Sequence, residues 1–543
     1  MRFTYLRPGF RPAVTTFLLV TLLIPGIASS VQRVEDGQLS VESLPFSYRA
    51  EWANYRPAIH ITPEKHWMND PQRPLLIDGI WHYYYLYNAD YPHGNGTEWY
   101  HMTSKDLVHW QEHGVAIHKY KNGLGDIQTG SAVVDVNNTA GFGAGAVIAI
   151  VTQQHDGVQR QSLFISTDGG YHFKAYDDNP IMDNPGAEHW RDPKIVWDEK
   201  HRKWIMALAE GNKIGFYTSP DLKRWTHQSD FHRNDLGLLE CPDLFQLSLD
   251  GDPSKTRWIL ASGANGFRTG KTTGTAYWIG NWDGKRFIPE RKEPQWLDAG
   301  ADFYAMVSWD DTRLDTKPGF NSRYAIGWLN NWAYATDLPT RQWSGAADSI
   351  VRQIKLQTVD GEAILTSKPI EAIAGLEGDA YTRSAVDVFE ASPTVFPKPL
   401  SDAYRLRVEL DAHSDAREIQ FRLKEKDGHF AVVGYNFNDK TVFVRRDSDA
   451  IASSMPKEYR AERSAAVRTL NGTVKLDIIV DTFSVEVFVN DGESALSNLI
   501  FGLPGSNALS AVSIGGNSVL RHLQLTPLKV APVQRYRTGP SSQ

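Results

Sequence analysis

The stretch YHMTSKDLVHW, residues 100–110, decides how the first half of this chain folds. An apolar and aromatic run leads to a turn centred on Asp106, and a second run opens on Trp110, which is the pattern of a β-hairpin. The same pattern returns three times along the chain. The repeats are LFISTDGGYHF (163–173), GFYTSPDLKRW (215–225) and YWIGNWDGKRF (277–287).

The shared turn aspartate falls at positions 106, 168, 221 and 283, a spacing of roughly 50 to 60 residues. β-Propeller blades are somewhat shorter, roughly 40 to 50 residues, but consist of the same antiparallel hairpins. Turns of this composition also recur in unrelated β proteins, so the prediction depends on the regular spacing. We predict an all-β chain with a five-bladed β-propeller over residues 55–350.

A polar residue precedes each hairpin at a matching phase of the repeat. These residues are Asp70 in NDP, Ser131 in TGS, Asp192 in RDP and Glu240 in ECPD, and Asp302 in ADFY follows at the next step. The first strand of each propeller blade lines the central axis, so these side chains should converge there. Because confined carboxyl groups raise one another's pKa, such a ring is unfavourable unless a function uses it.

Glycoside hydrolysis requires two carboxyl groups in opposite states, one ionised and one protonated. We expect Asp70 to stay ionised beside Asn69, and the apolar flanks of Glu240 to raise its pKa. Arg191 should keep Asp192 ionised, suited to holding sugar hydroxyls rather than to proton transfer. Asp-Pro turns and Arg-Asp surface pairs are common, so each motif by itself would be structural. Only their shared phase in the repeat favours a catalytic role.

The composition is that of a globular protein of more than one domain. The 543 residues exceed what one hydrophobic core usually serves, and 41% of them are hydrophobic. The net charge of −7 makes nucleic acid a poor partner. Cys241 is the only cysteine, which excludes an intramolecular disulfide and a cysteine-built metal site.

The first 30 residues have the pattern of a secretory signal peptide: basic residues, an apolar run and then small residues. We expect cleavage after Ala28 or Ser30 and a mature protein outside the membrane, either extracellular or periplasmic. An uncleaved membrane anchor is the alternative. The apolar run is shorter than the roughly 20 residues that a membrane span needs, and it contains Pro25, which disfavours an anchor.

The second half of the chain has a different pattern. Residues 351–379 are interpreted as a linker with a strand and a short helix, and strict alternation follows, as in VEVFVN (485–490). Period-2 alternation with NDG, KDG and NDK turns predicts a β-sandwich over residues 380–530. We interpret this domain as structural, with glycan binding as the alternative.

Eight motifs together resemble glycoside hydrolase family 32, the β-fructofuranosidases, inulinases and levanases. They occur in the order WMNDP, TGSAVV, WRDPK, ECPDLF, DFYA, GWLNNW, QWSGAADSIVRQ and, in the second half, VDTFSVEVFVNDGE. The resemblance covers about residues 55–525. It implies a five-bladed propeller followed by a β-sandwich, and a retaining double displacement on sucrose or fructans that needs no metal or organic cofactor.

The resemblance also implies roles for single residues. Asp70 would be the nucleophile, Glu240 the general acid/base and Asp192 the stabiliser of the transition state. For the tryptophans of the expected pocket, core packing is the alternative. The fructose pocket would be lined by Trp67, Asn69, Trp99, Ser131, Arg191, Asp302 and Trp332.

The chain departs from the family pattern at two places. Gln72 and Arg73 stand where most members continue NDPNG, and Leu86 stands where many have a Gln that helps hold fructose. A different donor must replace that Gln, or the pocket binds more weakly. A fructosyltransferase, an inactive fructan-binding protein and an inverting furanosidase are the alternatives, and the oligomeric state and glycosylation at Asn95, Asn137 and Asn471 stay open.

Overall fold

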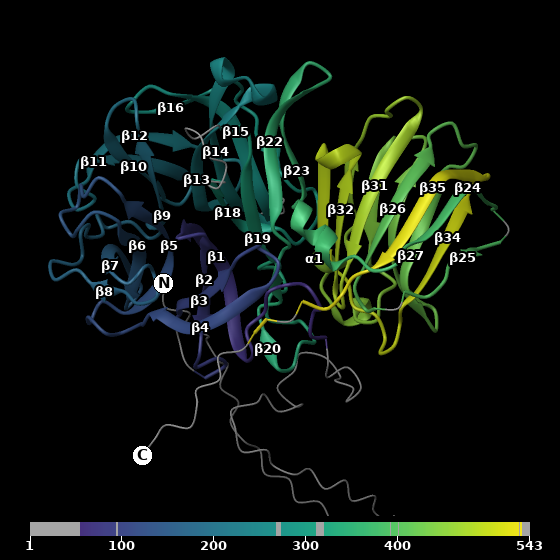
Figure 1. Cartoon of the computed structure of the whole chain (residues 1–543), viewed down its shortest axis with the longest axis horizontal. Coiled ribbons are helices and arrows are strands. Elements are labelled where there is room, and N and C mark those ends of the chain that lie inside the picture. The colour runs from purple at the N-terminus through teal and green to yellow at the C-terminus, as the bar shows by residue number, and fades with distance from the viewer. Residues whose placement is uncertain are drawn as a thin grey trace, which may run out of the picture.

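The computed structural model describes residues 55–93, 96–267, 273–310, 320–390, 392–399, 401–531 and 533–534. Two β domains lie side by side, five small sheets to the left in Figure 1 and two six-stranded sheets to the right. The predicted all-β class is confirmed. The expected signal peptide and the sequon at Asn95 lie outside the described residues. Within those ranges, no helix has the length and apolar character needed to cross a bilayer.

The first domain consists of five mainly antiparallel sheets that follow one another along the chain. The first two sheets contain β1 (His66–Ile77), β2 (Ile80–Asn88), β3 (Glu98–Ser104) and β4 (Trp110–Ile117), then β5 (Asp126–Asp135), β6 (Ala146–His155), β7 (Val158–Ser166) and β8 (Lys174–Ala175). The next two contain β9 (Arg191–Asp198), β10 (Lys203–Ala209), β11 (Lys213–Ser219) and β12 (Thr226–His232), then β13 (Leu238–Ser248), β14 (Thr256–Asn265), β15 (Thr273–Trp282), β16 (Phe287–Pro289) and β17 (Gln295–Trp296). The fifth contains β18 (Tyr304–Asp310), β19 (Arg323–Leu329), β21 (Ala347–Asp348), β22 (Arg352–Val359) and β23 (Glu362–Pro369).

The first strands of the five sheets form a closed ring. β1 contacts β5, β5 contacts β9, β9 contacts β13, β13 contacts β18, and β18 contacts β1 again. A separate cluster of apolar side chains fills the space between each pair of neighbouring sheets. This is the predicted five-bladed propeller, with the inner strands around one axis.

A short strand from the segment between β19 and β22 also joins the fifth blade to the first. β20 (Trp343–Ser344) pairs in parallel with the start of β1, His66 opposite Trp343. Gly345 follows with a φ of +91°, and a Cβ atom there would lie 1.8 Å from the carbonyl oxygen of Met68. Only glycine permits so close an approach of the two backbones.

The repeated aspartates form the turns between the third and fourth strands of the first four sheets. Asp221, for example, accepts hydrogen bonds from the backbone N–H groups of Lys223 (3.0 Å) and Arg224 (2.9 Å), and its other oxygen binds the Arg224 side chain. Asp106, Asp168 and Asp283 make equivalent turns. The predicted hairpins are therefore confirmed.

The predicted linker over residues 351–379 needs correction, because most of it belongs to the propeller. β22 pairs with β19 and β23 pairs with β22, so residues 352–369 supply the two outer strands of the fifth blade. The long segment between β19 and β22 interrupts the spacing that marks the other blades. The first domain thus extends to Pro369.

The second domain is a sandwich of two six-stranded antiparallel sheets around one apolar core. One sheet has the order β24 (Tyr381–Val388), β35 (Ser518–Pro527), β26 (Tyr404–Asp411), β31 (Thr473–Val480), β32 (Ser484–Val489) and β33 (Ser494–Leu499). The other has the order β25 (Thr394–Val395), β34 (Ala508–Ile514), β27 (Glu418–Lys426), β28 (His429–Asn436), β29 (Thr441–Arg445) and β30 (Arg463–Ala466).

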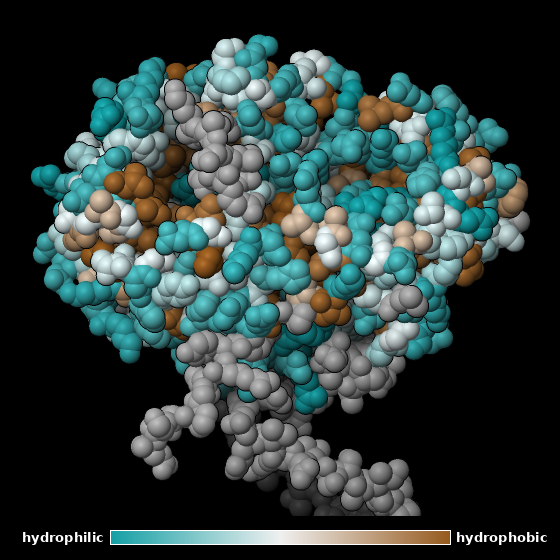
Figure 2. Space-filling model, viewed as in Figure 1, coloured by the Kyte–Doolittle hydropathy of each residue, from teal (hydrophilic) through white to brown (hydrophobic). Residues whose placement is uncertain are grey.

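Short helices connect the strands, and the surface is mainly polar. Hydrophilic side chains cover most of both domains in Figure 2, with apolar ones scattered among them. The helices are α1 (Lys457–Arg460) and the 3-10 turns η3 (Leu249–Gly251), η4 (Pro253–Lys255), η6 (Glu371–Leu376), η7 (Ala452–Ser454) and η8 (Asn490–Gly492).

Candidate active site

Three carboxyl groups lie at irregularities near the start of three inner strands. Asp70 is on β1, Asp192 on β9 and Glu240 on β13, and the pairing register shifts at each place. A bulge redirects the side chains around it, and proline interrupts the ladder because it has no N–H to donate. The prolines at these bulges are Pro71, Pro193 and Pro242.

The Asp70 carboxylate is held by its own strand and by the neighbouring blade. Its Oδ2 accepts a hydrogen bond from the Thr129 hydroxyl at 2.6 Å, and its Oδ1 accepts one from the Asn69 amide at 3.1 Å. Burial raises the pKa of Asp70, the Thr129 hydrogen bond opposes that rise, and the charge of Glu240 adds to it. The net effect is a pKa above the ordinary value.

Asp192 lies in the left-handed region, with a φ of +64°, and its side chain is buried. Its Oδ2 accepts a hydrogen bond from the backbone N–H of Cys241 at 2.9 Å, and the Arg191 guanidinium lies 3.9 Å away. Burial raises the pKa of Asp192 to about 7. The Arg191 charge lowers this pKa, but the charges of Asp70 and Glu240 raise it again.

Glu240 has three donors around it. Arg191 donates to Oε1 at 2.7 Å, while the Tyr304 hydroxyl and the Asn265 amide donate to Oε2 at 2.6 and 3.0 Å. Burial alone would raise the pKa of Glu240, but the charge of Arg191 and these hydrogen bonds outweigh it, so the pKa is lowered.

These environments reverse the pKa expectations drawn from the sequence. Glu240 was expected to have a raised pKa and Asp192 to be kept ionised by Arg191. In the structure the Arg191 guanidinium binds Glu240, which lowers the pKa of Glu240 and keeps it ionised. The pKa of the buried Asp192 is raised to about 7 instead. The sequence neighbours do not reveal this, because the decisive contact crosses from one blade to the next.

Cys241 connects the three acids. It follows Glu240 in the chain, its backbone N–H binds Asp192, and its thiol lies 3.4 Å from Asp70 Oδ2 and 3.7 Å from Asp192 Oδ2. Burial raises the pKa of this thiol well above its usual range, so it is protonated and acts as a weak donor. The three carboxyl groups therefore share one small polar site at the axis.

Aromatic rings form a wall beside the acids. Trp67 stacks on the partly exposed Trp332 with ring centres 6.2 Å apart, and the Trp67 indole N–H donates to Asn69 at 2.9 Å. Trp67 packs in the same cluster as Cys241 and Tyr304. The structure thus brings together Trp67, Asn69, Arg191 and Trp332 of the expected pocket, whose contact with sugar stays a prediction.

Three other expected pocket residues make structural contacts within the fold. Trp99 is fully buried between the first two blades, where its N–H donates to the Gln128 carbonyl. The Ser131 hydroxyl accepts the backbone N–H of Ile195 at 2.9 Å and joins β5 to β9. Asp302 is fully buried and binds Arg446 of the sandwich at 2.6 Å, so it belongs to the domain interface.

Three residues that contact the acids were missed at the level of sequence. Thr129 lies two residues before the expected Ser131, and Tyr304 lies two residues after the expected Asp302. In both cases the right motif was found, but a side chain two positions along it makes the contact with the acid. Asn265, at the end of β14, has no sequence signal that distinguishes it.

The departures from the family pattern have structural roles. Gln72 is fully buried, donates to the Asp70 carbonyl at 3.0 Å and accepts the Gly130 N–H at 3.0 Å, which ties β1 to β5. Arg73 extends to the Ile195 carbonyl (3.2 Å). Leu86 is buried in the cluster between the first two blades. Within the described ranges, no three His, Cys, Asp or Glu side chains are placed to hold a metal ion.

Glycoside hydrolysis requires carboxyl groups in contrasting environments, and the site provides them. The aromatic rings beside them offer an apolar surface for a ligand. Two family models match the chain: the glycosyl hydrolases family 32 N-terminal domain over residues 60–369 and the family 32 C-terminal domain over residues 376–527. The chain belongs to glycosyl hydrolases family 32 and is a glycoside hydrolase.

The relatives match most of the chain. A levanbiose-producing levanase of Bacillus subtilis is 41% identical over 486 residues, which are 87% of this chain and 90% of that levanase. A levanbiose-producing levanase of Geobacillus stearothermophilus is 45% identical over 392 residues, 70% of this chain and 96% of that protein. The crystal structure of exo-inulinase from Aspergillus awamori superposes with a TM-score of 0.79 at 28% identity, covering 88% of this chain and 99% of that one.

Proposed function

We propose that this protein hydrolyses β-fructofuranosyl linkages in fructans, with levan as the preferred substrate, through a covalent fructosyl-enzyme. The arrangement of Asp70, Asp192 and Glu240 on three inner strands, connected by Cys241, is the observation that carries the proposal. The levanases of Bacillus subtilis and Geobacillus stearothermophilus support levan as the substrate.

The first step forms the intermediate. An oxygen of ionised Asp70 attacks the anomeric carbon of the fructosyl unit and the bond to the leaving oxygen breaks, while Glu240 gives its proton to that oxygen. In the second step Glu240 takes a proton from water, the water oxygen attacks the same carbon, and the bond to Asp70 breaks. Asp192 accepts hydrogen bonds from sugar hydroxyls and offsets the positive charge of the transition state.

The resting site has the proton in the wrong place for the first step. Arg191 and Tyr304 keep Glu240 ionised, whereas burial raises the pKa of Asp192 to about 7, so that Asp192 holds a proton in part of the molecules near neutral pH. Sugar hydroxyls that donate to Asp192 stabilise its ionised form and lower its pKa. Binding of the fructosyl unit therefore releases the proton that Glu240 has to carry.

The test is a product profile of the purified protein on levan, inulin and sucrose. We expect sugar release from levan to be fastest, with either fructose or levanbiose as the first product. Asp70→Asn and Glu240→Gln should each lower turnover by several orders of magnitude with folding intact. Near-normal turnover by either variant contradicts the assigned roles, and products longer than the donor would mean transfer rather than hydrolysis.

The stereochemistry tests the covalent route. Retention requires that the first product keeps the β configuration at the anomeric carbon, which NMR follows during the first minutes of the reaction. Inversion would exclude an ester on Asp70.

We also propose that the protein is exported and that residues 1–30 are removed. The Aspergillus relatives named extracellular exo-inulinase, 32% identical over 510 residues, support this. The mass of the secreted protein should correspond to a chain that begins after Ala28 or Ser30.

A further inference from the structure

Arg191 makes two hydrogen bonds of different chemistry beside the three acids. One guanidinium nitrogen, Nη2, donates to Glu240 Oε1 at 2.7 Å. The other, Nη1, lies 2.8 Å from Nδ1 of His189, two residues earlier in the chain. The His189 side chain is 37% exposed and the Arg191 side chain 14%. An imidazole that solvent reaches is thus connected through one guanidinium to the buried carboxyl group of Glu240.

The donors available determine which way the first hydrogen bond points. A guanidinium can only donate, so Nδ1 of His189 accepts with its lone pair. The proton of the neutral ring is then on Nε2, which lies 4.0 Å from the Glu188 carboxylate. Protonation would put an N–H on Nδ1 as well, and two donors of like charge would face each other. The neutral imidazole can therefore hold Arg191, and the charged one cannot.

The backbone next to His189 is anchored independently of Arg191. Trp190 is buried between the second and third blades. Its backbone N–H donates to the Gln159 side chain at 2.8 Å, and its carbonyl accepts from the Gln161 side chain at 2.8 Å. Both glutamines are on β7 of the second blade. The fold thus positions the imidazole, and the imidazole in turn positions the guanidinium.

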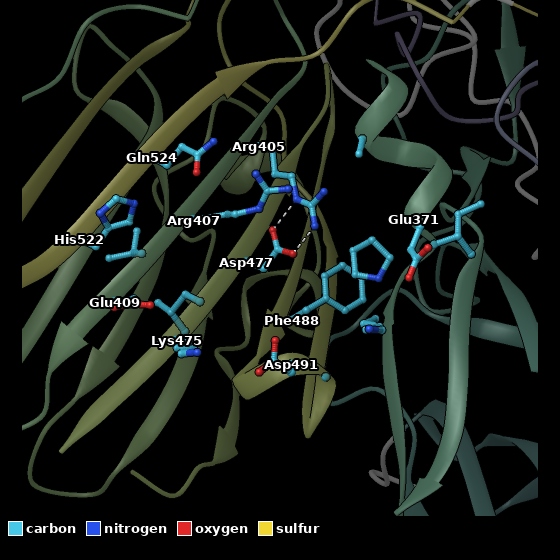
Figure 3. A pocket seen from close by; sticks show the side chains of 17 residues that line it. Glu371, Arg405, Arg407, Glu409, Lys475, Asp477, Phe488, Asp491, His522 and Gln524 are labelled. Atoms are coloured by element: carbon cyan, nitrogen blue, oxygen red, sulfur yellow. Dashed lines mark hydrogen bonds and ion pairs between the residues drawn. The ribbon is translucent and has the colours of Figure 1, made fainter. Parts of the chain in front are cut away.

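An arginine between the two domains shows what is different about Arg191. Dashed lines in Figure 3 join Arg405 to Asp477, through hydrogen bonds of 2.7 and 2.5 Å. Arg405 also binds Glu377 at 2.9 Å. Carboxylates of ordinary pKa stay ionised far below neutral pH, so they hold an arginine over a wide pH range. Arg191 has an imidazole on one side, and that contact changes in the range where histidine titrates.

The surrounding charges favour the neutral form of His189. Burial lowers the pKa of His189 and the charge of Arg191 lowers it further, while the charges of Glu188 and Glu240 oppose this. The net effect is a pKa below the ordinary value. Burial raises the pKa of Glu240, and the charge of Arg191 is the largest of the influences that lower it. Any group that holds Arg191 in place therefore acts on Glu240.

We propose that His189 is a positioning residue of the active site: its neutral imidazole holds Arg191 against Glu240 and so controls how readily Glu240 gains its proton. The inference rests on the proposed function for the role of Glu240. Because His189 acts through Arg191, it needs no contact with the sugar. In acid, protonated His189 releases Arg191, and Glu240 then keeps its proton up to a higher pH.

Three substitutions at one position separate this role from packing. His189→Asn places an amide oxygen where Nδ1 lies, so it still accepts from Arg191 but does not titrate. His189→Gln carries its amide one bond further out, and His189→Ala removes the acceptor. His109→Ala is the matched control, because it removes an exposed imidazole whose Nδ1 binds Asp106 at 2.7 Å in the turn between β3 and β4. The measurement is kcat/KM for sucrose and levan between pH 4 and 9.

We expect the alkaline limb of the profile to move to higher pH by about 0.5 unit or more in His189→Ala and His189→Gln. This is part of the roughly 1 to 3 units by which an adjacent opposite charge lowers a carboxyl pKa. His189→Asn and His109→Ala should keep the parental limb. Lost packing would lower the melting temperature without moving the limb. A parental limb in His189→Gln, or an equal shift in His189→Asn, overturns the proposal even if His189→Ala does not fold.

NMR of protein labelled at its histidine rings tests the contact without turnover. The signal that disappears in His189→Asn identifies His189, which should carry its proton on Nε2 and titrate below pH 6.5. The other tautomer, or a ring that is charged at neutral pH, contradicts the proposal. Failure of the proposed function has a different signature, since the parent would then release no sugar from levan, inulin or sucrose while the His189 signal stays as expected.

Discussion

Arg191 and Tyr304 are two of the three donors around Glu240, and both lower its pKa. The Arg191 guanidinium binds Oε1 and the Tyr304 hydroxyl binds Oε2. In the proposed mechanism Glu240 is a general acid that has to gain a proton when substrate binds, so each donor affects how readily it does so. Tyr304 is the more informative of the two to remove, because its loss changes no charge.

We predict that Tyr304→Phe raises the pKa of Glu240, because it removes a hydrogen bond to the ionised form. Such a bond is worth about 1.5 to 3 kcal/mol, which corresponds to about one pKa unit or more. The alkaline limb of the kcat/KM profile should move to higher pH by about that amount. The profile of initial rates between pH 4 and 9 measures it.

Tyr404→Phe is the control for the loss of a buried phenol. The Tyr404 hydroxyl lies in the sandwich core with no hydrogen-bond partner within the described residues. Its removal should leave the pH profile in place. A Tyr304→Phe profile that coincides with the parent would show that Glu240 does not control the alkaline limb.

The residues of the site were predictable to the extent that they follow the repeat. Asp70, Asp192 and Glu240 occur at the same phase of the blades, and the structure places all three at the axis. Asp302 does not lie at the site, because β18 begins only at Tyr304. The Tyr304 hydroxyl contacts Glu240 instead. Bulges make side-chain direction unpredictable from alternation alone.

At the scale of an element, the turn between the third and fourth strands is the unit that repeats. Its aspartate accepts two backbone N–H groups, and the next residue has positive φ, +61° at Leu222 and +96° at Gly284. The aspartate thus satisfies backbone donors that the turn would leave unpaired. The adjoining basic side chain adds only an exposed ion pair.

We predict that Asp221→Ala destabilises the protein by about 1 to 2 kcal/mol, since two backbone donors lose their acceptor. Arg224→Ala removes the ion pair alone and should change stability by less than about 0.5 kcal/mol. Urea unfolding followed by tryptophan fluorescence compares the two. Equal losses would mean that the ion pair, not the turn, provides the stabilisation.

The fifth blade shows why the boundary of the propeller was missed. Its first two strands and its last two are separated by the segment that carries Trp332, β20 and β21. That insertion moves β22 and β23 away from the expected spacing, so residues 352–369 resembled a linker. The pairing with β19 that identifies them is a tertiary contact.

At the scale of the whole molecule, buried charges join the two domains. His60, from the segment before β1, lies between Asp481 (2.7 Å) and Glu486 (2.9 Å) of the sandwich. Glu486 also binds Arg352 of the fifth blade, which binds Asp298 at 2.7 Å. All of these side chains are buried, so the domains form one unit.

His60 should make stability depend on pH. Burial alone would lower its pKa, but Asp481 and Glu486 outweigh burial and raise the pKa to about 9. Its contribution is therefore complete below pH 6.5 and is lost as the pH rises through about 9. The shift corresponds to a contribution on the order of 3 kcal/mol.

Thermal unfolding between pH 6 and 10 tests this contribution. His60→Gln keeps a hydrogen-bonding side chain but does not titrate, so its melting temperature should vary less over this range than that of the parent. Parallel curves for the two proteins would rule out His60 as the source.

A substitution at Asp302 tests whether this residue serves the domain interface rather than the sugar pocket. Asp302→Asn leaves the buried Arg446 without its counter-charge, which costs about 3 kcal/mol or more in comparable pairs. We expect lower stability with kcat/KM near that of the parent at temperatures where the variant is folded. A selective rise in KM, with stability intact, would return Asp302 to the sugar pocket.

The pairing of β20 with β1 also bears on how the enzyme is made. His66 meets Trp343 only after the inner strands of all five blades have been synthesised, and Asp70 follows four positions along the same strand. During translation the chain therefore carries Asp70, the proposed nucleophile, early, but Asp70 is not held in position until the last blade joins the first. We expect chains that end before Trp343 to be inert toward polysaccharide.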